Sequence, residues 1–238
     1  MRTCRLFSVR AHGQRDIGVF PNVRVVRTAL RDARAAAYER SRPEILEHVP
    51  LSARRVLDLG CATGATGKAL KDRQPANVTG IEIEPDYARE AEKNLDRVIV
   101  GDVAQPPKIL GTYDTLIAAD VLEHLVDPWA ALRHYTDLLE PGATAVVSLP
   151  NVAHLSTHAY LLKGTWPRKP EGIFDQTHLR WFTLRDAKQL LEQAGLRPQT
   201  VVKRRWLLHR GSRLDRYAPP LTPFTFQHVI AATYSPPR

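Results

Sequence analysis

Cysteine is scarce in this sequence, and long apolar runs are absent from it. Only Cys4 and Cys61 occur among the 238 residues, which argues against a disulfide framework and against a cysteine-based zinc site. No run of 18 apolar residues is present, so no membrane-spanning helix is expected. The first residues carry positive charge but lack the continuous apolar stretch of a secretory signal, and we therefore expect a cytoplasmic location.

Acidic residues are few at both ends of the chain. Residues 1–55 hold 12 Arg against 5 acids, and residues 197–238 hold 8 Lys or Arg against 1 acid. The middle of the chain has 14 basic and 19 acidic residues, so the overall charge of +9 comes from the two flanks. Basic flanks suit an anionic partner such as a nucleic acid, although a solvated arginine-rich surface explains the same pattern.

The clearest motif is an apolar strand that runs into a glycine-rich turn at Val56–Gly64. Gly60 and Gly64 allow the backbone to turn sharply and to approach a ligand closely. A dinucleotide-binding fold uses glycine in the same way, but Asp58 would repel a pyrophosphate. A carboxylate at this position suits a cationic ligand, or one that offers amine and hydroxyl donors.

Two further acids follow strands of the same pattern. Glu82 ends an apolar strand 24 residues after Asp58, where an acid would bind ribose hydroxyls. Asp102 follows the next strand and could accept a hydrogen bond from an adenine amine. These acids predict a nucleoside-containing cofactor.

From about Glu44 to Ala232 the chain resembles the class I S-adenosylmethionine-dependent methyltransferases. In that family the turn wraps the methionine part, the acid matching Glu82 holds the ribose, and the pair matching Asp102 and Val103 flanks the adenine. Ala62 stands where the family usually has glycine; because alanine prefers a negative φ, we expect a slightly different turn. The resemblance implies this set of cofactor-binding residues: Asp58, Gly60, Cys61, Ala62, Gly64, Glu82, Ile83, Asp102, Val103, Asp120 and Val121.

Strand and helix patterns alternate along the chain, which predicts an α/β fold. The resemblance implies a Rossmann-like, doubly wound, seven-stranded sheet, mostly parallel with the last strand antiparallel. We expect a basic N-terminal segment with cap helices in residues 1–50, including one or two helices in 28–48, and a methyltransferase domain in 51–238. The predicted strands are 55–60, 77–83, 97–101, 113–119, 144–149, 197–204 and 226–233. The predicted helices are 66–73, 86–95, 128–139 and 184–194.

Residues 150–181 have no strong core pattern and leave the sheet at the carboxyl end of the fifth strand. Ligands of open α/β sheets bind at that edge, and a long loop there is typically functional, so this lid is expected to form the substrate wall. The candidate substrate-binding residues are Asn151, His158, Trp166, Phe174, Asp175, Arg180 and Trp181. Histidines are the natural bases near neutral pH, and His124, His154 and His178 are the candidate catalytic residues.

Asp120, Glu123 and His124 would share one face of the turn after the fourth strand if that turn is helical. With His178 they resemble the arrangement that holds a divalent ion in small-RNA 2′-O-methyltransferases, except that Asp120 stands in place of a glutamate. Ubiquinone-biosynthesis O-methyltransferases share a similar Leu-Glu-His stretch. Three interpretations stay open. Glu123 and His124 could cap and pack the helix beneath the cofactor, His124 or His178 could act as general base or position the substrate, or the cluster could bind Mg²⁺, Mn²⁺ or Zn²⁺. A bound metal is not the favoured one.

The lid sequence resembles that of bacterial methyltransferases found among cell-surface sugar and secondary-metabolite enzymes. The first hypothesis is therefore O-methylation of a small bacterial metabolite, with N-methylation as an open alternative. The second is methylation of RNA held by the basic flanks, which predicts binding that weakens steeply with salt. The third is a non-catalytic module that binds the cofactor and a protein partner. A homodimer is compatible with each.

Overall fold

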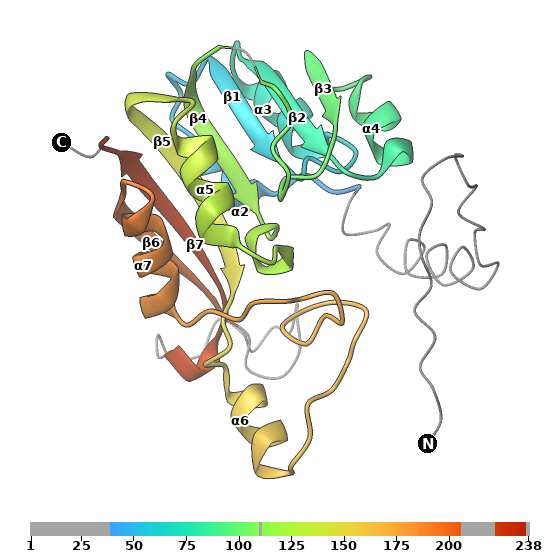
Figure 1. The fold of residues 1–238 in the computed structure, drawn as a ribbon, viewed down its shortest axis with the longest axis vertical. Helices are drawn as coiled ribbons and strands as arrows, with labels where there is room; N and C mark the ends of the chain where they lie inside the picture. The colour runs from blue at the N-terminus through green and yellow to red at the C-terminus, as the bar shows by residue number, and fades with distance from the viewer. Residues whose placement is uncertain (1–38, 110, 206–221, 237–238) are drawn as a thin grey trace, which may run out of the picture.

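A computed structural model of the chain describes residues 39–109, 111–205 and 222–236 (Figure 1). Its strands are β1 (Arg55–Leu59), β2 (Asn77–Glu82), β3 (Arg97–Val100), β4 (Tyr113–Ala119), β5 (Leu139–Pro150), β6 (Leu196–Arg205) and β7 (Thr225–Tyr234). Its α-helices are α2 (Pro43–Leu46), α3 (Ala65–Arg73), α4 (Pro85–Ala91), α5 (Pro128–Thr136), α6 (Leu155–Leu162) and α7 (Leu184–Gln193). Two short 3-10 helices are η1 (Leu122–His124) and η3 (Thr222–Phe224).

The seven strands form one sheet in the order β3-β2-β1-β4-β5-β7-β6. The pairs β3/β2, β2/β1, β1/β4 and β4/β5 are parallel, whereas β7 runs antiparallel to both of its neighbours. The strand order reverses beside β1, which places the carboxyl ends of β1, β2 and β4 around one crevice, the usual ligand site of such sheets. The predicted Rossmann-like sheet with an antiparallel last strand is confirmed.

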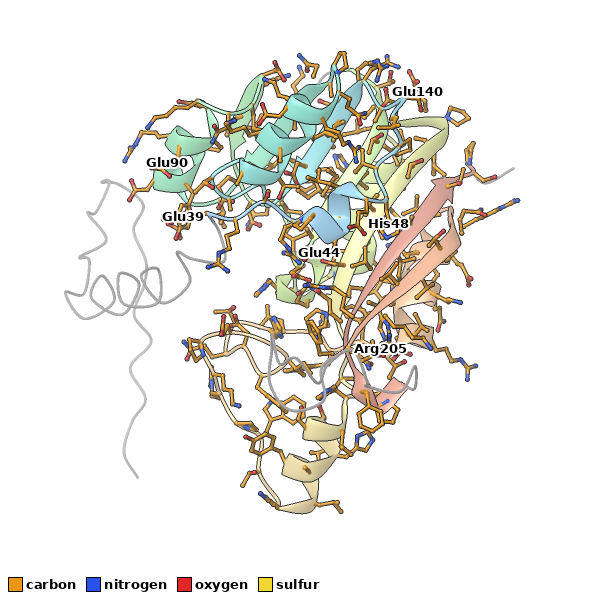
Figure 2. The ribbon with its side chains drawn as sticks, turned by 180° about the vertical axis from the view of Figure 1, so that it is seen from behind. Glu39, Glu44, His48, Glu90, Glu140 and Arg205 are labelled. Atoms are coloured by element: carbon orange, nitrogen blue, oxygen red, sulfur yellow. The ribbon has the colours of Figure 1, made fainter. Side chains whose placement is uncertain are left out.

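Helices cover both faces of the sheet, so the central strands are apolar on both sides. Leu57 and Leu59 of β1 pack in a core with α5 and α7, whereas Val56 points into a second core with Leu70 of α3 and Ile45 of α2. Figure 2 shows α2, with Glu44, on the face of the sheet opposite to α5 and α7. This doubly covered sheet is the rigid platform on which the site is built.

The helix boundaries follow capping chemistry. Pro85 and Pro128 occupy first-turn positions, and the Asp127 carboxylate accepts a hydrogen bond of 2.9 Å from the Ala130 amide. Thr183 and Asp186 form a reciprocal capping box at the start of α7. The predicted helix 128–139 is too long, because α5 ends at Thr136 and β5 already begins at Leu139.

The lid contains a helix that the apolar pattern did not predict. Only Thr157 of α6 is buried, and Leu162 is 90% exposed, so the helix has no core-facing apolar stripe. In Figure 1, α6 and the following loop stand beyond the end of the sheet, away from the two cores. Lid residues can therefore face a ligand instead of the core.

The expected N-terminal segment with cap helices in residues 1–50 stays a prediction. Within the predicted helical stretch 28–48, the structure describes residues 39–48, where α2 is one short helix with Pro43 in its first turn. Residues 1–38 lie outside the described part of the chain. No helix in the described part of the chain is long and apolar enough to cross a membrane.

Candidate active site

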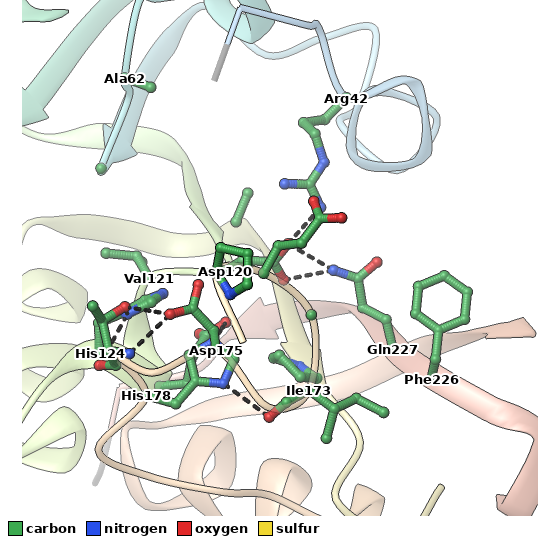
Figure 3. A pocket seen from close by; sticks show the side chains of 18 of the residues that line it. Arg42, Ala62, Asp120, Val121, His124, Ile173, Asp175, His178, Phe226 and Gln227 are labelled. Carbon is green, nitrogen blue, oxygen red and sulfur yellow. Dashed lines mark hydrogen bonds and ion pairs between the residues drawn. The ribbon is translucent and has the colours of Figure 1, made fainter. Parts of the chain in front are cut away.

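A cavity of about 1840 Å³ opens at the carboxyl ends of the central strands (Figure 3). Its walls come from the turn after β1, the ends of β2 and β4, the 3-10 helix η1, the lid, and the start of β7. The segment 40–44, which includes the first residues of α2, closes one side. Its volume exceeds the roughly 300–1,000 Å³ of a typical small-molecule site, so there is room for a cofactor and a second molecule.

The turn after β1 is held in a left-handed conformation at three residues. Gly60 and Gly64 have φ values of 69° and 75°, and Ala62 has a φ of 49°. The expectation that Ala62 would change the turn is wrong, because this residue adopts the conformation that glycine would take. A non-glycine residue there costs roughly 1–2 kcal/mol. The Ala62 amide offsets part of this cost by donating a hydrogen bond of 2.8 Å to the Glu82 carboxylate.

Asp58 and Glu82 form an acidic pair at this end of the cavity. Both are buried, with 3% and 7% of their surfaces exposed. Burial, reinforced by the charge of Glu82, raises the pKa of Asp58 to about 7. Burial also raises the pKa of Glu82, although its oxygens accept hydrogen bonds from the Ala62 and Glu84 amides. Burial makes this acidic pair costly to ionise, and a nearby positive charge lowers that cost, so the pair is suited to a cationic ligand.

The other predicted cofactor residues continue this wall. Ile83, Asp102, Val103 and Val121 all line the cavity, and the Asp102 carboxylate caps the Ala104 amide at 2.8 Å. Gly64 does not line it. A Cβ atom on Gly64 would lie 3.0 Å from Leu95 and 3.2 Å from Ala91, so this glycine is needed for packing of the turn against the region of α4.

Asp120 is the centre of a polar network that the sequence did not predict. Its side chain accepts hydrogen bonds from Ser148 at 2.7 Å, from Gln227 at 2.6 and 2.7 Å, and from Arg42 at 2.7 Å. Arg42 also binds Glu44, which in turn pairs with Arg204 at 2.8 Å. Figure 3 shows Arg42 and Gln227 converging on Asp120.

These contacts stabilise the ionised form of the Asp120 carboxylate at the cavity wall. Burial alone would raise its pKa, but Arg42, Ser148 and Gln227 outweigh that effect, and the pKa of Asp120 is lowered. Asp120 has a φ of 54°, and only Leu122–His124 form a short 3-10 helix. The expectation of one helical face shared by Asp120, Glu123 and His124 is therefore wrong.

Glu123, His124 and His178 form an acid–histidine cluster facing the cavity. The Nε2 atom of His178 lies 3.8 Å from Oε1 of Glu123, and the two imidazole centroids are 4.8 Å apart. The Glu123 carbonyl accepts hydrogen bonds from the Leu179 and Arg180 amides at 2.9 and 3.0 Å. The lid is thereby joined through its backbone to η1, which brings His178 to a residue distant in sequence.

The electrostatics of the cluster favour neutral side chains. Glu123 is 1% exposed, and neither of its carboxylate oxygens has a hydrogen-bond partner among the described residues. Burial and the charge of Asp120 raise the pKa of Glu123 well above its usual range. Burial, with His124 nearby, lowers the pKa of His178 to about 4. His178 Nδ1 lies 3.3 Å from the Ile173 carbonyl, which leaves Nε2 on the Glu123 side as the basic nitrogen.

The predicted lid residues divide into two groups. His154, Phe174, Asp175 and His178 line the cavity. His154 also caps α6 through Nδ1, which accepts a hydrogen bond from the Ser156 amide at 3.2 Å. The residues that do not line the cavity are Asn151, His158, Trp166, Arg180 and Trp181.

The candidate lid residues that do not line the cavity make contacts elsewhere in the fold. Asn151 is buried and holds β7 by donating a hydrogen bond of 2.7 Å to the Thr225 carbonyl. Arg180 and Trp181 line a separate surface hollow beside α5 and α7, and Trp166 stacks edge-on against Phe174 and Trp181. For these side chains the structure supports packing roles.

The four residues considered as a metal site are not assembled as a set. Asp120 is held in its own network, and the remaining ligand atoms of Glu123, His124 and His178 lie within 4.8 Å of one another. An ion with bonds of about 2.1 Å holds its ligands within about 4.2 Å, so the three side chains would have to close further. One carboxylate with two imidazoles would suit a transition metal better than Mg²⁺.

Several cavity residues had no signal in the sequence. Arg42, just before α2, and Gln227 of β7 contact Asp120, and Arg204 of β6 joins them through Gln227 and Glu44. No local motif could reveal these contacts. Tyr160 and Lys169 line the lid side, and Phe226 lines the β7 side. The sequence shows the residue types of these three side chains but not that they line the cavity.

A family model described as a methyltransferase domain matches residues 26–201. This range covers more than half of the chain, which therefore belongs to this methyltransferase family. The prediction of a class I S-adenosylmethionine-dependent methyltransferase is confirmed, and S-adenosylmethionine is its cofactor. The acidic pair and the glycine turn line the cavity at the carboxyl ends of β1 and β2.

Two curated relatives cover part of the chain. The ubiquinone biosynthesis O-methyltransferase of Xylella fastidiosa is 35% identical over 117 residues, which are 45% of this chain and 46% of the relative. The trans-aconitate 2-methyltransferase of Escherichia coli is 33% identical over 138 residues, 55% of this chain and 54% of the relative. The chain thus spans about half the length of the curated relatives it matches.

Solved structures show the same fold at low sequence identity. The S-adenosylmethionine-dependent methyltransferase of Thermotoga maritima has a TM-score of 0.65 at 18% identity, covering 89% of this chain and 97% of the other. The magnesium protoporphyrin IX methyltransferase of Synechocystis PCC 6803, solved with bound S-adenosylhomocysteine, has a TM-score of 0.57 at 18% identity, with coverages of 94% and 90%. These likenesses concern the fold.

Proposed function

We propose that this protein transfers the methyl group of S-adenosylmethionine to a hydroxyl oxygen of a small acceptor molecule. The observation that carries the proposal is one cavity with two chemically different ends. Asp58 and Glu82 form an acidic end, and the acid–histidine cluster lies across the same cavity, beside the lid. A cationic cofactor and a proton-yielding acceptor would meet between them.

At the acidic end, Asp58 would pair with the ammonium of the methionine part, and the glycine turn would allow close approach of the backbone. Glu82 and Ile83 would hold the ribose, and Asp102 with Val103 would flank the adenine. The bound cofactor supplies an electrophilic methyl group on a sulfonium. Alignment of the acceptor with that methyl can itself contribute roughly 7–11 kcal/mol to lowering the barrier.

At the other end, His178 accepts the proton of the acceptor hydroxyl. One C–O bond forms as one C–S bond breaks, and the hydroxyl proton moves to the imidazole Nε2, so the products are a methyl ether and S-adenosylhomocysteine. The Glu123 carboxyl group lies 3.8 Å from this nitrogen, and His124 packs against the same ring. General-base help of this kind typically contributes about 10²- to 10⁴-fold.

The test is incubation with methyl-labelled S-adenosylmethionine and a size-fractionated extract of the source organism. We expect label in a small, nuclease-resistant product, in a reaction that continues after treatment with a chelator. Label in nuclease-sensitive material, with loss of activity on chelation, would favour RNA methylation with a divalent metal at the cluster. Label on a nitrogen would show that the protein is an N-methyltransferase. Absence of transfer to any fraction would favour a non-catalytic module that binds the cofactor. A cytoplasmic location belongs to this proposal.

A further inference from the structure

Lys169 is a cation of the lid that has no carboxylate partner within ion-pair distance among the described residues. It lines the cavity, and its ammonium lies 5.5 Å from the ring centre of Tyr160 and 5.8 Å from that of Phe174. Glu171 of the same loop also lines the cavity but makes no ion pair with it. The lysine is thus held over two aromatic faces instead of being neutralised.

Two hydrogen bonds hold the main chain of Lys169, and its side chain is exposed. The Lys169 amide donates a hydrogen bond of 2.8 Å to the Phe174 carbonyl, and its carbonyl accepts one of 2.9 Å from the Gln176 amide. Phe174 is 5% exposed and meets the rings of Tyr160 at 5.0 Å and Trp166 at 5.2 Å, both nearly edge-on. The ammonium is therefore presented from an ordered aromatic cluster.

Two arginines of the cavity wall are already compensated, whereas Arg40, in the segment before α2, lines the cavity without an ion pair among the described residues. Arg42 and Arg204 share the carboxylates of Asp120 and Glu44. The cofactor end holds Asp58 and Glu82, whereas the lid side of the cavity combines Lys169 with the carboxylates of Glu171 and Asp175. An acceptor with a negative group would be repelled by Asp58 and Glu82 and attracted by Lys169, which would orient it with its hydroxyl toward the cluster.

We infer that the acceptor carries an anionic group, a carboxylate or a phosphate, which binds to Lys169, while its apolar part lies on Tyr160 and Phe174. This inference rests on the proposed function, because it names the substrate class of the same cavity. It deepens that proposal by assigning a specificity-determining residue in the lid, and it requires no metal and no further chemical step.

The test uses two catechols of the same ring size, 3,4-dihydroxybenzoate and uncharged catechol, titrated into the protein saturated with S-adenosylhomocysteine. Calorimetry should show that the carboxylate compound binds about tenfold more tightly, as expected for a charge-assisted hydrogen bond. Lys169→Met should remove this preference. Lys163→Met is the matched control, because Lys163 is an exposed lid lysine outside the cavity and its variant should keep the preference.

Equal binding of the two catechols, no binding of either, or a preference that survives Lys169→Met would overturn the inference. The preceding titration with S-adenosylhomocysteine keeps the two proposals apart. Failure to bind S-adenosylhomocysteine counts against the proposed function. Tight binding of S-adenosylhomocysteine without any carboxylate preference counts against the role of Lys169 alone.

Discussion

His178 and Glu123, from the lid and from the turn after β4, meet with their side chains 3.8 Å apart in the wall of one cavity. Two backbone hydrogen bonds to the Glu123 carbonyl, from the Leu179 and Arg180 amides, also join the lid to the turn after β4. It places a neutral imidazole and a buried carboxyl group where an acceptor would bind.

His178→Ala is expected to lower turnover more than about tenfold, because it removes the proton acceptor. The affinity for S-adenosylhomocysteine should stay unchanged, since His178 lies away from the acidic end of the cavity. His158→Ala is the control, because His158 belongs to the same lid but does not line the cavity. Steady-state kinetics with the labelled acceptor and calorimetry of S-adenosylhomocysteine decide the matter; unchanged turnover in the His178 variant would exclude its role as base.

The affinity for S-adenosylmethionine should increase with pH between 6 and 8. The pKa of Asp58 is raised to about 7 in the protein without ligand, and a cationic ligand favours the ionised form, so binding releases a proton. The dissociation constant should fall about tenfold over this interval. Asp58→Asn should weaken binding and flatten the pH dependence; a slope that persists in this variant would assign the titration to another group.

Arg42→Met should destabilise the fold by about 1–3 kcal/mol at pH 7, because Asp120 loses its charged partner. The pKa of Asp120 is lowered in the folded protein, so its contribution is present above the unfolded pKa and is lost as the pH falls. The difference between wild type and variant should therefore shrink toward pH 3.

Arg55→Met provides the comparison for Arg42. Arg55 pairs with Glu140 at the same distance of 2.7 Å, but the two side chains are 50% and 39% exposed. Such a pair contributes about 0–1 kcal/mol. Denaturant unfolding measures both variants, and equal losses would show that the network around Asp120 adds nothing to stability.

Gly64→Ala and Ala62→Gly should change the free energy of unfolding by very different amounts, although both residues have a left-handed backbone. At Gly64 the added methyl combines a φ of 75° with contacts of 3.0–3.3 Å, and we expect a loss of about 2–3 kcal/mol. At Ala62 the substitution relieves strain but adds chain entropy in the unfolded state, so stability should change by less than about 1 kcal/mol. Thermal unfolding compares them, and a large loss in Ala62→Gly would contradict the backbone account.

The sheet and the acidic end of the cavity could be predicted from sequence because their signals are local. Apolar runs followed by Asp58, Glu82 and Asp102 mark strand ends, and parallel strands bring such ends together. The conformation of Ala62 was not predicted, because intrinsic preference was overridden by the hydrogen bond to Glu82.

The lid side of the cavity could be predicted only in part. His178 and Phe174 were found from their residue types, but α6 has no buried stripe and gives no periodic signal. The partners of Asp120 are Arg42 before α2, Ser148 of β5 and Gln227 of β7, so the network exists only through the tertiary fold. The sequence predicts Arg180 and Trp181 on the substrate wall, whereas in the structure they line a different hollow. Their sequence position shows that they belong to the lid but not which way they face.

A crystal structure of the complex with S-adenosylhomocysteine would test the central claim most directly. We predict the adenosyl group between Glu82 and Asp102, the ammonium at Asp58, and the sulfur facing the acid–histidine cluster across a space that can hold an acceptor. A ligand bound elsewhere in the cavity, or a sulfur turned away from His178, would contradict the account.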